Sequence, residues 1–243
     1  MGSHSNSSAG AARPNRYRIM GVDVSGSGTG ATLSYVGRYD NLRTDLLAWD
    51  SGNVHGLGAN FFGLTASAAT GVVPETVGGF NIEGLSFAPG STTTAYVAFR
   101  APIVPASGRT NALIVPVTNF NTLVTANPST GPATFGAPIQ LNLGGRGIRS
   151  IECSADGCLI VAGSADGAGN FQLYAWSGVA GETPIPVNAV LTSMNPEGLV
   201  STPTGAIGTW NSQFIELISD MGDTIWYNDG IIAKDLTIPE IRK

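Results

Sequence analysis

The sequence contains few charged residues. Asp, Glu, Lys and Arg together make up 12% of its 243 residues, about half of the quarter that is usual in soluble domains. Acidic residues outnumber basic ones, 17 to 12, which gives a formal net charge of -5. Because no cluster of Lys or Arg is present that could follow a phosphate backbone, the composition argues against a nucleic-acid partner.

Long apolar runs and helical periodicity are also missing. No segment approaches the ~20 consecutive apolar residues of a membrane span, and no heptad pattern is sustained, so an integral membrane protein and a coiled coil are excluded. Apolar residues nevertheless make up 42% of the chain, enough to bury a substantial core. The length predicts a single domain over residues 1–243.

Short apolar and β-branched runs, separated by Gly, Asn, Asp, Pro and Ser, fill most of the chain and predict an all-β fold. The stretch from Asp50 to Phe80 is the least strand-like, and we expect a long irregular insertion there, with a helical turn around Leu64 to Ala69. The expected strands are Tyr17 to Val24, Thr32 to Tyr39, Leu46 to Trp49, Ile82 to Phe87, Thr94 to Arg100, Ala112 to Val117, Ile139 to Leu143, Ile148 to Cys153, Leu159 to Gly163, Phe171 to Trp176, Gly198 to Thr202, Ala206 to Thr209, Phe214 to Ser219 and Thr224 to Tyr227.

Three segments share one plan, in which a strand with an ionic side chain precedes a turn and a further strand. They begin at Asn81, Ile148 and Asn195, and their separation suits four-stranded propeller blades, one of them with an insertion. A β-sandwich is the alternative all-β fold, but it gives no reason for the same motif, Asn-x-Glu-Gly-Leu, to begin at both Asn81 and Asn195. The repeats therefore predict a β-propeller.

These segments and several others together resemble a bacterial β-propeller family that is catalogued as a domain of unknown function. This family is distantly similar to esterase-like and phytase-like propellers. The resemblance implies a propeller fold and, for most members, export from the cytoplasm, but no established reaction. The matching stretches are GSHS at residues 2–5, RPNRYR (Arg13 to Arg18), GFNIEGLSFAPG (Gly79 to Gly90), AYVAFRAPIVP (Ala95 to Pro105), LGGRGIRSIE (Leu143 to Glu152), NPEGLV (Asn195 to Val200) and SDMGDTIWYNDG (Ser219 to Gly230).

Members of that family carry further strands before the Gly-Ser-His-Ser stretch, so we interpret Met1 to Ser5 as native sequence and the chain as an incomplete propeller of about four blades. The open blade edges leave backbone N–H and C=O groups unpaired, which predicts a homo-oligomer, most simply a two-fold dimer. The sequence starts without a signal peptide and, expressed as it stands, is expected in the cytoplasm. Its Ser-, Thr-, Asn- and Gly-rich, Lys-poor composition instead suits an exported protein.

The two cysteines flank a turn. Cys153 and Cys158 enclose Ser-Ala-Asp-Gly, which places their sulfur atoms on adjacent strands of a hairpin. A cross-strand disulfide is one interpretation, and two half-buried free thiols, favoured because such pairs are geometrically demanding, is the other. Together with the distant His4 and His55 the cysteines form no zinc pattern.

Ionic residues on the innermost strands of propeller blades converge on the central channel, and Glu83, Arg149 and Glu197 occupy this position in the three repeats. One interpretation is a salt-bridged plug with Arg149 between the two glutamates. The other is a functional site in which Glu83 and Glu197, with Asn81 and Asn195, are oxygen ligands of a divalent metal. Such ligands favour Ca²⁺, with Zn²⁺ or Mn²⁺ as alternatives. Propeller hydrolases such as paraoxonases, gluconolactonases and phytases use a channel calcium in this way, which is a likeness of architecture.

Three further side chains are candidates for the same site. Arg146 and Arg149 in GGRGIR are able to clamp a phosphate or carboxylate between two guanidiniums, unless both only tie neighbouring blades through backbone carbonyls. His4 is a candidate general base if the N-terminal loop folds over the channel, with an exposed terminal histidine as the alternative. His55, in the glycine-rich insertion, has the same two interpretations.

We therefore expect a hydrolase of activated esters, with phosphoesters, including phosphotriesters, ahead of carboxylic esters and lactones. A metal or the arginine pair would assist the reaction, with Glu83 and Glu197 as ligands or bases and His4 as a proton shuttle. The alternative is a non-enzymatic, exported propeller that binds a ligand or partner and uses its ionic ring only to hold the blades in register. No Gly-x-Ser-x-Gly elbow and no P-loop is present, which excludes an α/β-hydrolase esterase and a P-loop nucleotidase.

Overall fold

The structure is a computed structural model that describes residues 2–189, 191 and 194–220, and the backbone of the short strands at 227–228, 231–232 and 240–242. Within these residues the chain is mostly β, and every strand pair is antiparallel. The strands are β1 (Ile19–Ser25), β2 (Thr32–Tyr39), β3 (Asn81–Phe87), β4 (Ala95–Ala101), β5 (Ala112–Val117), β6 (Ile139–Leu141), β7 (Gly147–Ser154), β8 (Gly157–Gly163), β9 (Gln172–Trp176), β10 (Ile185–Val187), β11 (Pro196–Leu199), β12 (Glu216–Ser219), β13 (Tyr227–Asn228), β14 (Ile231–Ile232) and β15 (Glu240–Arg242). The helices are α1 (Leu42–Ser51), α2 (Leu64–Ser67) and α3 (Phe120–Leu123), with 3-10 turns η1 (Pro14–Tyr17), η2 (Gly28–Gly30) and η3 (Ile207–Ser212).

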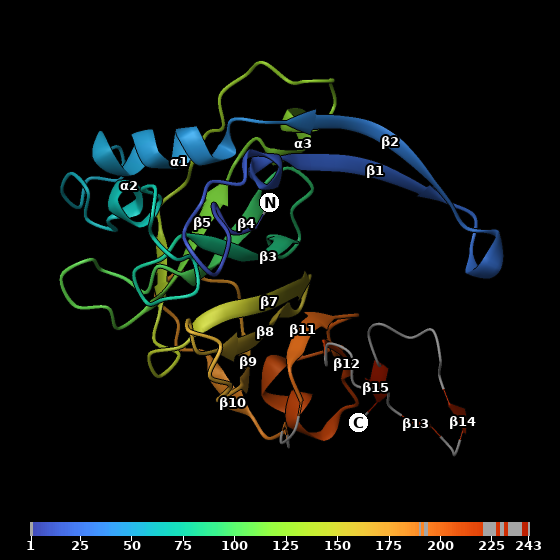
Figure 1. The fold of residues 1–243 in the computed structure, drawn as a ribbon. Coiled ribbons are helices and arrows are strands. Elements are labelled where there is room, and N and C mark those ends of the chain that lie inside the picture. Colours follow the sequence, from blue (N-terminus) through green and yellow to red (C-terminus); the bar gives the residue numbers. More distant parts are fainter. Residues whose placement is uncertain are drawn as a thin grey trace.

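Two four-stranded sheets repeat the same topology. In the first sheet β3, β4, β5 and β6 follow one another in chain order, and in the second β7, β8, β9 and β10 do the same. A third sheet contains β11, β12 and β15. The first strands of the three sheets are neighbours, since β7 contacts β3 on one side and β11 on the other (Figure 1). The all-β prediction is confirmed, and most expected strands lie within a few residues of an observed one.

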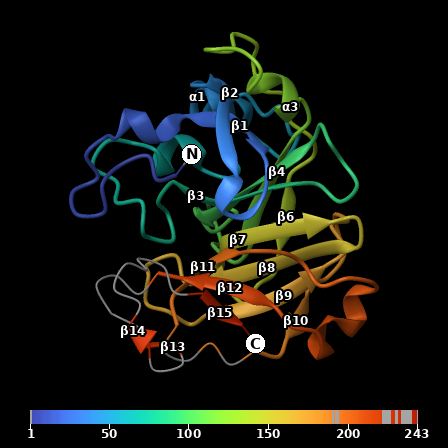
Figure 2. The ribbon, with the colours of Figure 1, turned by 90° about the vertical axis from the view of Figure 1, so that its right-hand side faces the viewer.

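Side chains on the two faces of each sheet alternate between different cores. Along β4, Val97 and Phe99 point into a core that α1 and the insertion cover, while Tyr96 and Ala98 point toward the second sheet. A further core lies between the second and third sheets, where Leu159 packs with neighbouring aliphatic and aromatic side chains. Because both faces are covered, β4, β5 and β8 are buried along their whole length. The sheets are stacked face against face (Figure 2), and side chains of facing sheets together form the cores between them.

Helix α1 corrects one expected strand. Leu46 to Trp49 belongs to this helix and not to a strand. Leu42, Leu46 and Trp49 are buried at spacings of four and three residues, which is the periodicity of one helix face. The four apolar residues Leu46 to Trp49, considered without Leu42, do not reveal this helical spacing.

The remaining differences are local. The strand expected at Ala206 to Thr209 is instead the start of the 3-10 turn η3, with Ala206 as its N-cap. The strand expected from Gly198 to Thr202 starts and ends earlier, as β11. Strand β10 was not expected. Of the strand expected at Thr224 to Tyr227, only Tyr227 falls within the described residues, as part of β13. The insertion between residues 51 and 80 contains no strand, and its helical turn at Leu64–Ser67 is confirmed.

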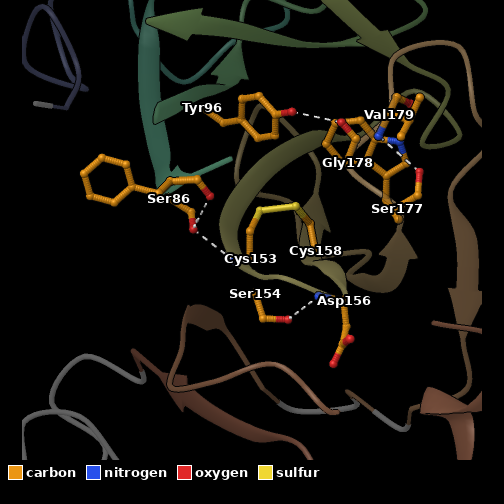
Figure 3. The surroundings of a disulfide bond; sticks show 11 residues. Ser86, Tyr96, Cys153, Ser154, Asp156, Cys158, Ser177, Gly178 and Val179 are labelled. Atoms are coloured by element: carbon orange, nitrogen blue, oxygen red, sulfur yellow. Dashed lines mark hydrogen bonds between the residues drawn. A yellow bond between two sulfur atoms is a disulfide. The ribbon is translucent and has the colours of Figure 1, made fainter. Parts of the chain in front are cut away.

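The cysteines form a disulfide, so the free-thiol interpretation was wrong. Cys153 and Cys158 are directly paired residues of β7 and β8, with Cα atoms 4.0 Å apart. Figure 3 shows that Ser86 of β3 lies beside this hairpin, where its Oγ accepts a hydrogen bond from the backbone N–H of Cys153 at 3.0 Å. The crosslinked hairpin is therefore joined to the first sheet.

Reducing the disulfide is expected to lower the free energy of unfolding by about 2 kcal/mol, because it closes only a short loop in the unfolded chain. Urea unfolding of the wild type, oxidised and after treatment with a reductant, measures the difference. A Cys153→Ala/Cys158→Ala double variant should unfold at the same urea concentration with and without reductant. An unchanged midpoint for the reduced wild type contradicts the prediction.

Gly84 explains part of the repeated motif. A Cβ atom at this position would lie 2.7 Å from Cβ of Ala98 and 2.9 Å from Cγ2 of Ile151. The glycine therefore lets β3 approach β7 closely. At Gly198, the matching position in β11, a Cβ atom would lie 3.4 Å from Ile218, which is an ordinary contact.

We expect Gly84→Val to destabilise the fold by about 1–3 kcal/mol, because the extra carbons overpack the contact between the first two sheets. Thermal unfolding measures this as a lower melting temperature. Gly131 is the matched control, because a Cβ atom there meets no atom within 4 Å and its φ is not positive. Equal melting temperatures for Gly84→Val and Gly131→Val would contradict the close approach.

Candidate functional site

The ionic residues predicted from the three repeats meet in space. Glu83 on β3, Arg149 on β7 and Glu197 on β11 form a continuous contact. Nε of Arg149 lies 3.0 Å from Oε2 of Glu83, and NH2 of the same guanidinium binds Oε1 of Glu197. The Arg149 side chain is 5% exposed, and those of Glu83 and Glu197 are 19% and 29% exposed. The expectation that these groups converge is confirmed.

A β-bulge places each of the three side chains. In β3, Ile82 and Gly84 pair with consecutive residues of β4, which leaves Glu83 without a partner in the ladder. The same irregularity leaves Arg149 unpaired in β7 and Glu197 unpaired in β11. A bulge turns its extra residue away from the regular alternation of the strand. The repeated motif therefore encodes a bulge with a charged residue at the same point of three first strands.

Arg100 is a fourth charged member that the sequence analysis missed. Its side chain, on β4, is 6% exposed, and NH1 binds Oε1 of Glu83 at 2.9 Å while NH2 lies 3.4 Å from Oε2 of Glu75. Its Nε donates to the carbonyl oxygen of Ala165 at 3.0 Å. We call Glu75, Glu83, Arg100, Arg149 and Glu197 the bulge cluster. The signal for Arg100 was an arginine within the otherwise apolar run AYVAFRA.

The bulge cluster contains three carboxylates and two guanidiniums. Burial raises the pKa of the Glu197 carboxyl above its usual value, although contact with Arg149 acts in the opposite direction. The negative charge of Glu83 contributes to the increase in this pKa.

Arg149 is incompletely hydrogen-bonded. Among the described residues, its NH1 is buried and has no hydrogen-bond acceptor, and its Nε has none despite the short contact to Glu83. The guanidinium also lies over the ring of Phe171, with Cζ 5.6 Å from the ring centroid. A buried N–H without an acceptor is costly, so NH1 is the position of the cluster where an oxygen atom from outside would be bound most favourably.

The two asparagines of the predicted metal set have other contacts. Asn81 is buried, and its Nδ2 donates to Oε1 of Glu83 at 2.9 Å. The backbone N–H of Asn195 donates to Oγ of Ser219, and its carbonyl oxygen accepts from the N–H of Asp220. The side-chain amide of Asn81 and the backbone of Asn195 are therefore both engaged in ordinary hydrogen bonds.

A divalent cation does not fit the bulge cluster well as it stands. Within the part of the chain that the structure describes, no group of three or more His, Cys, Asp or Glu side chains is arranged to hold a metal. Glu83 and Glu197 both face Arg149, so a cation between them would have to displace or face a positive charge. The calcium site stays a prediction that this geometry does not favour.

Arg146 has a separate set of partners. Its Nε donates to the carbonyl oxygen of Asn170 at 2.7 Å, its NH2 to Oδ1 of Asn170 at 2.7 Å, and its NH1 to the carbonyl oxygen of Leu143 at 3.1 Å. These bonds join the turn before β7 to the loop before β9. For Arg146 the structure therefore matches the interpretation in which the guanidinium ties backbone carbonyls, and a clamp shared with Arg149 is not formed.

Both histidines are buried, so the exposed interpretation of His4 was wrong. Nδ1 of His4 lies 3.1 Å from the carbonyl oxygen of Phe80, to which only a protonated nitrogen is able to donate. His55 is held between Asp50, whose Oδ1 is 3.2 Å from Nε2, and the backbone N–H of Leu57, which donates to Nδ1. These bonds order the N-terminal segment and the insertion, and the side-chain partners of both histidines lie outside the bulge cluster.

Comparison with protein-family models, with curated proteins and with solved structures finds no match for this chain. In the described part of the chain, no helix is both long and apolar enough to cross a bilayer. The functional argument therefore depends on the geometry of the bulge cluster.

The raised pKa of Glu197 predicts how stability depends on pH. Since folding raises this pKa, the folded state binds the proton more tightly than the unfolded state does, and the contribution of Glu197 to stability falls as pH increases through the raised value. We therefore expect the wild type to lose stability relative to Glu197→Gln as the pH rises from about 4 to 7.

Urea unfolding at a series of pH values measures this difference. Glu182→Gln, which removes an exposed carboxylate outside the cluster, controls for the general effect of one negative charge. If the free energy of unfolding of the wild type instead increases with pH relative to that of Glu197→Gln, attraction to Arg149 outweighs burial.

Proposed function

We propose that the chain is an incomplete β-propeller in which the three sheets act as consecutive blades. Two observations support this arrangement: the first and second sheets have the same four-strand topology, and the first strands of all three sheets are neighbours. The equivalent bulges on β3, β7 and β11 support it further. In such an assembly the first strands line the axis, where ligands are commonly bound.

We propose that the bulge cluster binds and hydrolyses activated esters, with Arg149 in place of a metal as the electrophilic group. The observation that carries this proposal is the buried NH1 of Arg149, which has no acceptor in the described part of the chain, beside a partly exposed carboxyl whose pKa is raised. Directed at a phosphoryl or carbonyl oxygen, NH1 stabilises the negative charge that develops there in the transition state.

Glu197 is the proton acceptor in this proposal. It takes a proton from a water molecule, the water oxygen forms a bond to phosphorus or to the acyl carbon, and the bond to the leaving alkoxide or aryloxide breaks. The proton on Glu197 then passes to the leaving oxygen or to solvent. Glu83 and Arg100 act on Arg149 through their ion pairs, and we regard them as positioning residues.

The charge of the cluster favours a neutral substrate. Three carboxylates face two guanidiniums, so a doubly charged phosphate monoester is repelled more than a triester is. The more exposed Glu197 marks the side of the cluster that is open to a substrate. Neutral phosphotriesters therefore come before charged phosphate monoesters.

A second candidate function is supported by the ion pairs themselves. Arg149 lies between Glu83 and Glu197, and Arg100 between Glu75 and the same Glu83, which is the arrangement expected of a plug that holds the sheets in register. In this case the chain is a non-enzymatic module that binds a ligand or partner. Breaking a buried ion pair by removing one partner costs about 3–5 kcal/mol, so the network is able to play this role alone.

Export from the cytoplasm is a further part of the proposal. The disulfide between Cys153 and Cys158 supports it, because structural disulfides persist mainly in oxidising compartments. The family resemblance and the low lysine content agree with this.

Turnover of a chromogenic aryl phosphotriester before and after dialysis against a chelator tests the hydrolase proposal. We expect activity to survive the chelator and Arg149→Lys to lower kcat/KM by about 100-fold, because the fork of N–H donors is lost while one positive charge remains. Arg38→Gln, which removes a guanidinium paired with Asp40 outside the cluster, should leave kcat/KM unchanged.

The other outcomes are equally informative. Activity that disappears with the chelator and returns with Ca²⁺ would support the predicted metal site instead. If no tested ester is turned over, while Arg149→Lys lowers the melting temperature, the bulge cluster is structural and the binding module is the better description.

A further inference from the structure

The β1–β2 ribbon projects from the body of the protein. Figure 1 shows this two-stranded hairpin extending away from the stacked sheets, and η2 connects its two strands at the tip. Among the described residues neither edge of the ribbon pairs with a third strand. Only its base is anchored, where the N–H of Arg38 donates to the carbonyl oxygen of Ala126 and the hydroxyl of Tyr35 donates to Oδ1 of Asn127 at 2.9 Å.

One face of the ribbon is apolar and exposed. Val22 pairs with Tyr35 and Val24 with Leu33 across the two strands, so these four side chains lie on the same face, which we call the arm face. Leu33 is 73% exposed and Val24 is 68% exposed. The side chains between them in sequence point to the opposite face and are polar: Asp23, Ser25, Thr32 and Ser34.

Such a ribbon requires a cover. An isolated two-stranded hairpin is marginally stable in water, and an exposed apolar face of roughly 400 Å² is of the size that marks interaction sites. Charge and proline give the edges of the arm little protection, since Asp23 is the only charged residue and no proline is present between Ile19 and Gly37. A single bulge, at Val36, interrupts the ladder near the base.

We propose that the arm face is the dimerisation surface of this protein and that its occupant is the arm face of a second copy. A two-fold interface brings a surface against the same surface of a second copy. A patch of one charge would repel its copy, whereas the four side chains of the arm face are uncharged. Two arm faces bury about 800 Å² together, and the exposed Met20 beside them brings the total near the ~1,000–1,200 Å² of the smallest specific interfaces.

A lipid surface is the weaker alternative occupant. Membrane-binding segments combine apolar side chains with Lys and Arg that meet anionic headgroups, whereas the arm has no basic residue before Arg38 and the chain has a net charge of -5. This dimer also differs from one made by open blade edges, because it uses a side-chain face rather than unpaired backbone groups.

Two neighbouring positions provide a matched test. Leu33 and Ser34 are both exposed and adjacent, but they lie on opposite faces of the ribbon. We expect the wild type to be a dimer by light scattering and analytical ultracentrifugation in the micromolar range. Leu33→Glu should raise the dimer dissociation constant at least about tenfold, because two glutamates would be buried at the contact. Ser34→Glu, with the same change in charge, should leave the dissociation constant unchanged.

A crosslinking experiment gives a second readout that does not depend on folding stability. Both natural cysteines are in the disulfide, so Val24→Cys introduces a single free thiol on the arm face. We expect rapid oxidation to a covalent dimer for Val24→Cys and none for Ser34→Cys. A monomeric wild type, equal effects of Leu33→Glu and Ser34→Glu, or flotation of the wild type with zwitterionic lipid vesicles would each overturn the proposal.

Discussion

The contact of Arg149 with Glu83 and Glu197 is the interaction on which the arrangement of the three sheets depends. One guanidinium, nearly excluded from solvent, bridges carboxylates that belong to the first strands of two other sheets. Removing any partner leaves an uncompensated charge in a site of low dielectric constant. Hydrophobic packing holds adjacent sheets together with little directional preference, whereas these ion pairs require all three first strands to be correctly aligned.

The β-bulges make this contact compatible with buried strands. A charged residue in the regular alternation shared by Ile148 and Ile151 of β7 would point into the apolar core between the first and second sheets. Because Arg149 is the extra residue of a bulge, it leaves this alternation and the residues on either side continue it. The cost is a locally unpaired backbone, which is repeated at Glu83 and Glu197. The same solution at three equivalent points is what a repeated sequence motif is expected to encode.

Recurrence in the sequence also decided which features were predictable. Glu83, Arg149 and Glu197 were found because a charge interrupts an apolar strand at the same place in three segments. Arg100 occurs once, near the end of an apolar run that looks like an ordinary buried strand, so its only signal was a single charge without a counterpart in the other repeats. Helix α1 was missed since four apolar residues in a row fit a strand as well as a helix, and only the wider spacing of Leu42, Leu46 and Trp49 separates the two. The disulfide was left open because a turn sequence fixes which residues pair but not the orientation of their side chains.

The outer face of the first sheet is covered differently from the faces between the sheets, and this difference accounts for the arm. Between the first, second and third sheets each face is buried by the next sheet. The outer face of the first sheet has no neighbouring sheet among the described residues and is covered instead by α1 and the insertion. Of the preceding strands, β1 and β2, only the base contributes to this core, through Ile19 and Tyr39. Further along the ribbon, the alternation of apolar and polar residues, which suits a half-buried sheet, finds no sheet to pack on within the described chain. A segment with the pattern of a blade but without a blade's neighbours has to bury its apolar face elsewhere, and a second copy of the same ribbon offers the surface that matches it.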